Sequence, residues 1–585
     1  MHMSKITTHL HLIILVAIIA LAAVFRLTGI HWDSKSHLHP DERFLTMVAT
    51  EITLPNSLQS YLDTRTSPAN PHNKKFSFYV YGTYPMHIAK FVATVSHQHT
   101  YDGITVVGRI LSTAVDLVTL LLVFLIASHL SKRQSVGLLA AFCYAISVLP
   151  IQLSHFFTVD PYITLFTTMV LWQIIRGRMG FLLGVTAGLA ISAKVSGALI
   201  LPVIGIGYCM LWPWNGQSKT IWKTRKELVI KALFFLLGLF LTLRLAYPYL
   251  FVGFSVNPLI LANWKQLASF NEPTTSFPPG LQWVSVLPTQ PTLDLLVWGF
   301  GIPLTVFAVT TLIRLLQIAI KKRTLPEATP LILWIVLVLG YQSLQFAKPM
   351  RYFWPIYPSL AVLSGLGLSY GYTFLTKNTR HKFIRYAVFF IITTILLIWP
   401  ISYLSIYTKP HTRIRASAWM YQHIPEGQTI AWEHWDDPLP FPMEGFPAPS
   451  IYKQIQLPSF DPDDTDKSEK IMAVVRESDY IVLSSNRAYG ALLKSKERFP
   501  FMADFYTRLF SGDLGFELAA QFTSRPTIPF PWTNICLYVP GFGYGAASRM
   551  LEECDEGGIS FIDDYADETF TVYDHPKVLI FKKVK

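Results

Sequence analysis

Long blocks of apolar residues are the feature that most constrains how this chain folds. A helix needs roughly 20 apolar residues to cross the hydrocarbon core of a bilayer, and eleven blocks in the sequence meet or approach that length. They are residues 10–29, 105–129, 136–151, 161–176, 181–195, 197–213, 229–249, 294–318, 328–346, 352–374 and 384–405. The blocks 181–195 and 197–213 meet at the sequence KVSG, and we interpret them as two crossings rather than one broken helix.

The low charge content supports a membrane protein. Only 15% of the residues are charged, whereas soluble proteins average about 25%. The fold class predicted is therefore a polytopic α-helical membrane protein with about 11 transmembrane helices. The net charge of +12 needs no nucleic-acid partner, because much of the basic excess falls in the short loops between the apolar blocks.

Those short loops also predict the orientation, since Lys and Arg are enriched in loops on the cytoplasmic side. With eleven crossings, six basic clusters fall on one side: Lys5, SKR at 131–133, RGR at 176–178, KTIWKTRK at 219–226, KKR at 321–323 and KNTRHK at 377–382. We expect a multi-pass cell-membrane protein with a cytoplasmic N-terminus. The small-residue run ALAAVF leaves open a cleaved signal peptide, but Arg26 directly after it and the loop count favour a retained helix.

Two domains are expected. Residues 1–405 form the transmembrane domain, in which the outer loop 30–104 carries short surface helices at 42–52 and 84–97. Residues 406–585 form a soluble extracytoplasmic domain, and residues 250–293 form an ordered outer loop.

In the tail, helix patterns at 412–424 and 466–478 each precede a strand pattern, at 428–435 and 479–486, and residues 568–583 contain two strand-like runs. This alternation predicts a small α/β domain. Cys536 and Cys554 lie in this domain, where a disulfide is chemically open to them.

Acidic residues follow the first apolar block in the sequence HPDERF. Pro40 suits the first position of a helix, which places Asp41 and Glu42 in its first turn, where the helix dipole favours the ionised carboxylate. A generic pair of this kind often only caps a helix. Asp160, in HFFTVDP, is a second acid on the same expected side of the membrane and again stands beside a proline. We therefore take Asp41, Glu42 and Asp160 as catalytic candidates.

Cations lie at the same expected depth. Lys194, Arg244 and Arg351 each stand near the outer end of an apolar block. A charge in such a place is a functional candidate, although a long side chain near a helix end also reaches water by itself. Two acids and three cations in one leaflet indicate a polar pocket. Lys194, Arg351, Arg244 and Arg43 are the candidates for binding a donor phosphate.

Such a pocket suits the transfer of a sugar from a lipid phosphate. The phosphate leaves as a stable anion, so the reaction needs cations on the phosphate and one carboxylate to accept the proton of the attacking hydroxyl. Glycoside hydrolysis, by contrast, uses two carboxylates that flank the bond.

The chain resembles the GT-C membrane glycosyltransferases that use polyprenyl-phosphate sugars, the group that contains protein O-mannosyltransferases and aminoarabinose transferases. The resemblance covers roughly residues 10–405, and its specificity lies in the order and spacing of its motifs. These are HPDERF, YVYGTYPMHIAKF, VGRILSTAVDL, HFFTVDP, GVTAGLAISAKVSG and RYFWPIYP. The tail, with EHWDDPLP and YDHPKVLIF, is similar to the extracytoplasmic portion of a prokaryotic branch.

The resemblance implies an inverting transferase that moves a sugar from a polyprenyl-phosphate donor to a hydroxyl of a glycan, lipid or protein acceptor. The first-loop acidic motif of the group falls on Asp41 and Glu42, its second-loop acid on Asp160, and its cation on Lys194. The substrate-binding candidates are Tyr81, Tyr84 and His155.

Two other functions also agree with the sequence. A transporter or flippase of lipid-linked sugars would share the cationic pocket, but we find no internal repeat of the kind such proteins show. A non-enzymatic envelope assembly protein would not need Asp41. No cofactor is required, although nearby histidines (His37, His39 and His155) leave a divalent cation open. We interpret the EHWDD sequence at 433–437 as the polar end of a strand rather than as a cation or sugar site.

Overall fold

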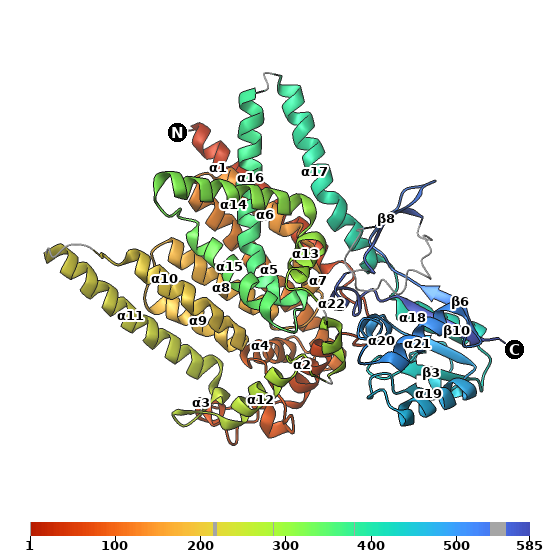
Figure 1. Ribbon diagram of the computed structural model, residues 1–585. Helices are drawn as coiled ribbons and strands as arrows, with labels where there is room; N and C mark the ends of the chain where they lie inside the picture. The colour runs from red at the N-terminus through yellow and green to blue at the C-terminus, as the bar shows by residue number, and fades with distance from the viewer. Residues whose placement is uncertain are drawn as a thin grey trace.

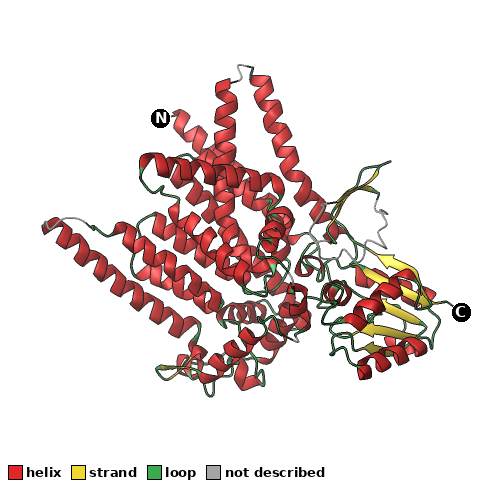
Figure 2. Ribbon diagram, viewed as in Figure 1, coloured by secondary structure: helices red, strands yellow, loops and turns green. Residues whose placement is uncertain are grey.

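The computed structural model describes residues 2–214, 219–275, 277–284, 286–378, 381–538, 557–564 and 566–584. Most of its helices form one large bundle, and its larger sheet, with the helices of the tail around it, lies to one side of that bundle (Figures 1 and 2). The predicted fold class, a mostly helical membrane protein with a C-terminal region that contains β-sheets, is confirmed. The domain boundary after residue 405 stays a prediction, and helix α17 ends at Leu404.

Each predicted apolar block contains a helix. The helices are α1 (His2–Leu27), α5 (Tyr101–Ser131), α6 (Gln134–Ala145), α7 (Val148–Ser154), α8 (Asp160–Ile175), α9 (Phe181–Ala193), α10 (Leu201–Leu211), α11 (Lys219–Ala246), α14 (Ile302–Lys322), α15 (Thr329–Leu344), α16 (Tyr357–Asn378) and α17 (Lys382–Leu404). Block 136–151 is the pair α6–α7, which bends by 59°.

In the described part of the chain, fewer helices than the eleven predicted crossings are long and apolar enough to span a membrane. Within the described ranges, five helices are long and apolar enough to span a membrane, and α6–α7 makes a sixth if the pair is one span. The helices at 181–193, 195–211 and 329–344 are apolar but shorter. Block 181–213 forms two separate helices, α9 and α10, joined by the 3₁₀ helix η2 (Val195–Ile200). The count of eleven crossings remains a prediction.

Short helices of the first segment expected on the outer side lie at one end of the bundle (Figure 1). They include α2 (Pro40–Glu51), α3 (Leu58–Leu62), η1 (Pro71–Lys74) and α4 (Tyr84–Val95). Residues 250–293, expected to be an ordered loop, contain η3 (Pro248–Leu250), the hairpin β1 (Phe251–Val252) and β2 (Ser255–Val256), α12 (Pro258–Ser269), η4 (Pro278–Trp283) and α13 (Gln290–Asp294). The π-helical turn η5 (Leu295–Gly299) leads into α14, and η6 (Met350–Ile356) leads into α16.

The tail folds around a five-stranded sheet in the order β4-β3-β5-β10-β6. Its strands are β3 (Thr429–Glu433), β4 (Lys453–Leu457), β5 (Tyr480–Leu483), β6 (Phe516–Phe522) and β10 (Val578–Lys583). Strand β3 runs parallel to β4 and β5, whereas β10 is antiparallel to both β5 and β6. A smaller sheet contains β7 (Thr527–Ile528), β9 (Gly558–Ile562) and β8 (Asn534–Tyr538).

The helices of the tail agree with most of the predicted pattern. They are η7 (Ser405–Thr408), α18 (Thr412–His423), η8 (Pro449–Ile451), α19 (Thr465–Glu477), α20 (Arg487–Leu492), α21 (Pro500–Ser511) and α22 (Glu568–Thr571). Both predicted helix–strand units, α18–β3 and α19–β5, are present. The prediction of two strands in 568–583 is wrong, because its first half forms α22, which the Asp567 side chain caps by accepting a hydrogen bond from Thr569 N. Cys536 lies on β8, but Cys554 lies outside the described residues.

Candidate active site

The site begins at the N-terminus of α2. His39 is the N-cap residue, and its Nδ1 accepts a hydrogen bond from the backbone N–H of Glu42 (3.3 Å). Pro40 follows at the first helical position, where its missing N–H costs no hydrogen bond. This local chemistry begins the helix at Pro40 and puts Asp41 and Glu42 next to each other in the first turn. Because successive helical residues point about 100° apart, their side chains enter different surroundings.

Glu42 points into the protein. Its side chain is fully buried, and it accepts hydrogen bonds from Arg109 Nε (3.0 Å) and from the backbone N–H of Phe157 (2.7 Å). Arg109 also donates to both carboxylate oxygens of Asp33, at 3.1 and 2.8 Å. These contacts tie α2 to α5 and to the loop before α8, so Glu42 acts in the site by holding α2 in place.

Asp41 points to a more open place. It forms an ion pair with Arg351 of η6, and the exposed fractions of the two side chains are 22% and 18%. The Nε of Arg351 is buried and has no hydrogen-bond partner among the described residues. Burial by itself raises the pKa of Asp41, but the neighbouring charge of Arg351 outweighs it and lowers that pKa to about 2. Asp41 is therefore a carboxylate at neutral pH.

The second acid forms a matching pair. Asp160 begins α8, and its Oδ1 accepts a hydrogen bond from Lys194 Nζ at 2.9 Å. Lys194 stands at the C-terminal end of α9, where the backbone becomes extended before η2, so its side chain leaves the helix at a break. The Tyr352 ring joins the two pairs, since Lys194 Nζ lies 4.3 Å and Arg351 Cζ 5.5 Å from its centre.

A tight backbone contact brings the aromatic loop before α4 to this site. The N–H of Gly82 donates to the carbonyl of Ala193 at 3.0 Å, and a Cβ at Gly82 would lie 1.5 Å from the carbonyl oxygen of Ser192. Only glycine permits this approach. It places Tyr81 beside Asp41, and burial and this carboxylate together raise the pKa of the Tyr81 hydroxyl. Tyr84 packs edge-on against Tyr162 at 5.8 Å between ring centres.

Three other predicted residues have partners elsewhere. Arg244 donates to the carbonyl of Gly253 (3.1 Å) and lies over the Phe251 ring. Arg43 pairs with Asp437 of the tail at 3.1 Å. His155 is buried with its two ring nitrogens 2.8 Å from the carbonyl oxygens of Ile151 and Thr28. The structure thus brings together Asp41, Asp160, Lys194, Arg351 and Tyr81, and does not add these three to them.

The EHWDD sequence joins the tail to itself and to α2. Asp436 and Asp437 both accept hydrogen bonds from Arg413, at 2.6 and 2.8 Å, and Asp437 also pairs with Arg43. Glu433 is buried, and burial raises the pKa of its carboxyl to about 8. These contacts favour the interpretation as polar structure at the end of a strand.

Sequence reasoning missed an aromatic residue of the tail. The Tyr573 ring lies against His39, the cap of α2, with ring centres 4.4 Å apart. His39 is also stacked on Phe156 at 4.4 Å. No local pattern around Tyr573 indicates this role, because its neighbours in the site are more than 200 residues away in sequence. Arg109, by contrast, could have been found as a charge inside an apolar block.

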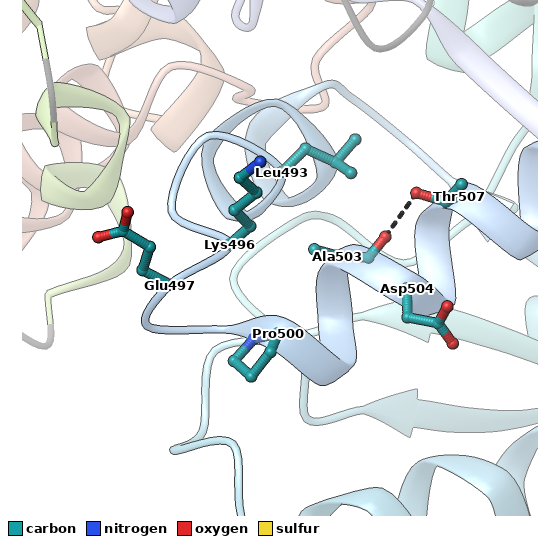
Figure 3. A pocket seen from close by; sticks show the side chains of 7 residues that line it. All are labelled: Leu493, Lys496, Glu497, Pro500, Ala503, Asp504 and Thr507. Atoms are coloured by element: carbon teal, nitrogen blue, oxygen red, sulfur yellow. Dashed lines mark hydrogen bonds between the residues drawn. The ribbon is translucent and has the colours of Figure 1, made fainter.

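Metal sites and surface hollows add nothing to this arrangement. Among the described residues, no group of three or more His, Cys, Asp or Glu side chains is placed to hold a metal ion. Figure 3 shows a hollow on the tail. Its lining residues, between Leu493 and Thr507, include none of the paired acids and cations.

Comparison with known families confirms the resemblance. Residues 84–254 match the family model described as dolichyl-phosphate-mannose-protein mannosyltransferase. This part of the chain is mannosyltransferase-like. The match contains Asp160 and Lys194, and it confirms the predicted enzyme class, a glycosyltransferase, for the segment that it covers. A comparison with curated proteins found no match.

Solved structures of three glycosyltransferases are similar to the chain at low identity. The oligosaccharyltransferase AglB from Archaeoglobus fulgidus is 12% identical with a TM-score of 0.49, over 99% of this chain and 89% of that one. ArnT from Cupriavidus metallidurans, bound to undecaprenyl phosphate, is 13% identical with a TM-score of 0.44, over 82% and 94%. The Pmt1-Pmt2 complex of Saccharomyces cerevisiae is 17% identical with a TM-score of 0.30, over 41% and 33%. At these scores we base no argument on them.

Proposed function

We propose that this protein transfers a sugar from a polyprenyl-phosphate donor to an acceptor hydroxyl, with inversion, on the outer face of the membrane. The observation that carries the proposal is the pair of acid–cation contacts, Asp41–Arg351 and Asp160–Lys194, joined through Tyr352. Asp160 is buried, whereas the other three side chains are still partly exposed. The mannosyltransferase-like segment supports a lipid-phosphate donor.

Arg351 and Lys194 are the proposed phosphate ligands. Arg offers a planar fork of N–H donors that matches a phosphate, and Lys offers a mobile point charge. The Arg351 side chain is 18% exposed, so its guanidinium is open to a phosphate oxygen. As the sugar leaves, negative charge grows on the phosphate, so these two cations stabilise the transition state more than the ground state.

Asp41 is the proposed base. Its carboxylate accepts the proton of the acceptor hydroxyl while the hydroxyl oxygen forms a bond to the anomeric carbon. The bond from that carbon to the phosphate oxygen breaks, and the lipid phosphate leaves with the electron pair. Attack from the face opposite the phosphate inverts the configuration.

Donor binding also prepares the base. Without donor, the carboxylate of Asp41 neutralises Arg351. A phosphate on Arg351 competes for the same N–H donors and releases Asp41 for the acceptor hydroxyl. Asp160 is proposed to keep Lys194 directed toward the phosphate, since their contact of 2.9 Å fixes the position of the ammonium group. Tyr81, beside Asp41, and Tyr84 are proposed to line the sugar side of the site.

The outward orientation rests on the basic loops and is tested by labelling. Single cysteines at Gln59 and Asp466, both exposed, should react with a membrane-impermeant thiol reagent in intact cells, and one at exposed Arg323 should not. Reversed labelling would place the site on the cytoplasmic side and overturn the outer-face proposal.

The function itself is tested by turnover. Purified protein in detergent or liposomes is given radiolabelled polyprenyl-phosphate sugars, the mannose donor first, with a cell-envelope extract as the source of acceptor. We expect label to move from the lipid to a product of different mobility. A protein that only carries the lipid donor across liposomes, with no loss of label from the lipid, would make it a transporter instead.

A further inference from the structure

The tail reaches into the proposed site through one segment, residues 566–577, which we call the strap. It contains α22 and the YDHPK sequence, and it runs between the helix bundle and the larger sheet (Figure 1). Two of its contacts reach η6, which carries Arg351, and the cap of α2, which carries Asp41.

The strap holds the helix that carries Arg351. The carboxylate of Asp567 accepts a hydrogen bond from the backbone N–H of Met350 at 3.0 Å, at the start of η6. The same carboxylate caps α22 through Thr569 N (2.8 Å). Asp567 is 5% exposed and so is shielded from water. The position of Arg351, one residue after Met350, therefore depends on the tail.

The strap also holds the helix that carries Asp41. The Tyr573 ring lies 4.4 Å from the ring of His39, which is 1% exposed and caps α2. The carbonyl of Tyr573 accepts a hydrogen bond from His411 Nε2 at 3.0 Å, which holds the backbone at this residue. The ring of the capping histidine thus packs against Phe156 of the bundle and against Tyr573 of the tail.

A buried polar network anchors the strap directly after Tyr573. Asp574 Oδ2 accepts hydrogen bonds from Tyr407 (2.7 Å), Tyr403 (3.2 Å) and Gln152 (3.0 Å). Its other oxygen pairs with His575, whose Nε2 lies 2.9 Å from Asp563. Burial opposes a charge on His575, but the two carboxylates outweigh it and raise its pKa to about 10. A charged, fully paired cluster of this kind keeps a segment in one arrangement.

We infer that the strap is a working part of the proposed transferase site, and that Tyr573 is a positioning residue that holds the His39 cap, and through it Asp41, at the correct place beside Arg351. The inference rests on the proposed function and goes beyond it, because it gives the tail a part in the reaction. The aromatic ring of Tyr573 carries this role, since the ring is what lies against His39.

The pH dependence of turnover distinguishes a positioning role of Tyr573 from a purely structural one, because a loss of packing alone would not change it. Burial lowers the pKa of His39 to about 4, and the charged groups that face it are Asp41 on α2, Arg351 on η6, Asp160 on α8 and Asp574 on the strap. Three of these are acids. When the Tyr573 ring is removed, water reaches His39 and its pKa rises. A protonated Nδ1 can no longer accept from Glu42 N–H, so the cap is lost on acidification.

The experiment compares Tyr573→Ala with Tyr573→Phe and with Tyr421→Ala in the full-length protein. Tyr421 is a matched control, because it is a half-buried tail tyrosine whose ring stacks on Phe446 at 5.2 Å. We expect Tyr573→Ala to lower kcat by about 10- to 100-fold, within the range expected of a misplaced catalytic group. Tyr573→Phe should keep at least about a third of wild-type kcat, and Tyr421→Ala should match the wild type.

The acid limb of kcat/KM should move up by at least about one pH unit in Tyr573→Ala and should stay in place in Tyr573→Phe. Equal kcat and an equal acid limb in Tyr573→Ala and the wild type would overturn the inference while the proposed function stands. An equal loss in Tyr573→Ala and Tyr421→Ala would also overturn it, as a general effect of tail stability. Absence of turnover in the wild type itself would instead sink the proposed function, which separates the two failures.

Discussion

Two clusters of carboxylates and cations meet the first turn of α2, and they differ in their access to water. On one side, Glu42 and Asp33 enclose Arg109, and all three side chains are 3% exposed or less. On the other, Asp41 faces Arg351, and each of these side chains keeps about a fifth of its surface open. The same chemical groups are sealed in the first cluster and open to a ligand in the second.

The difference supports the proposal that the substrate binds at the open cluster. In the sealed cluster, the carboxylate oxygens of Glu42 accept bonds from Arg109 and Phe157, so nothing is left for a ligand. In the open cluster, the side chains of Arg351 and Asp41 are still 18% and 22% exposed. Burial with complete pairing indicates structure, whereas a partly exposed pair can exchange its partner for a ligand.

Breaking the sealed cluster should have the largest effect. Removal of one partner of a buried ion pair costs about 3–5 kcal/mol, which is a large part of the stability of a typical protein, about 5–15 kcal/mol. We expect Arg109→Met to leave little folded protein, measured as the monodisperse fraction in detergent and as Tm. A well-folded and active Arg109→Met protein would show that the sealed cluster is not structural.

Asp41→Asn should leave the fold intact and abolish most turnover. Removal of a general base typically costs about 10²–10⁴-fold, and we expect a kcat loss in that range at near wild-type Tm. Asp102→Asn is the matched control, because Asp102 is also an ion-paired aspartate in the first turn of a helix, α5. Similar kcat values for the two variants would reduce Asp41 to a helix cap.

The cations of the open cluster should affect donor binding. We expect Lys194→Ala and Arg351→Lys to raise the KM for the donor by about 10-fold or more and to lower kcat, because hydrogen bonds to a charged partner are about twice as strong as neutral ones. Arg244→Ala, which removes a side chain directed at Gly253 and Phe251, should change both by less than about threefold. A larger effect at Arg244 would move the donor site toward α11.

The smallest effect concerns pH. In the free enzyme, Arg351 overcomes burial and holds the pKa of Asp41 at about 2, so Asp41 stays ionised far below neutral pH. When the phosphate engages Arg351, this support is weakened and the pKa of Asp41 rises. The acid limb of kcat, which reports the complex, should therefore lie at higher pH than that of kcat/KM, which reports the free enzyme. Coincident limbs would argue that Arg351 stays on Asp41.

Much of the fold could be predicted from the sequence, because long apolar blocks and helix–strand alternation are local signals. Each block contains a helix, and the units α18–β3 and α19–β5 appear where expected. The first of the two strands predicted within 568–583 is absent because β-branched residues favour strands only in a suitable context. In this segment the Asp567 side chain caps the first turn of α22 and so favours a helix.

The candidate site was less predictable. Local patterns predicted four site residues, because charges at the ends of apolar blocks are unusual. These are Asp41, Asp160, Lys194 and Arg351. Which acid faces which cation depends on contacts between distant segments. The contrast between Asp41 and Glu42 depends on the direction of one helical residue relative to the next. Nothing local predicted Tyr573.

The central claim is that Asp41 both neutralises Arg351 at rest and takes the proton during transfer. Equilibrium binding of radiolabelled undecaprenyl phosphate to the wild type and to Asp41→Asn, measured together with turnover of the lipid-linked sugar, tests both roles at once. We expect Asp41→Asn to bind undecaprenyl phosphate as tightly as the wild type or more tightly, because Arg351 is free of its carboxylate, and yet to transfer almost no sugar. Weakened phosphate binding with turnover lost only in proportion would contradict the claim.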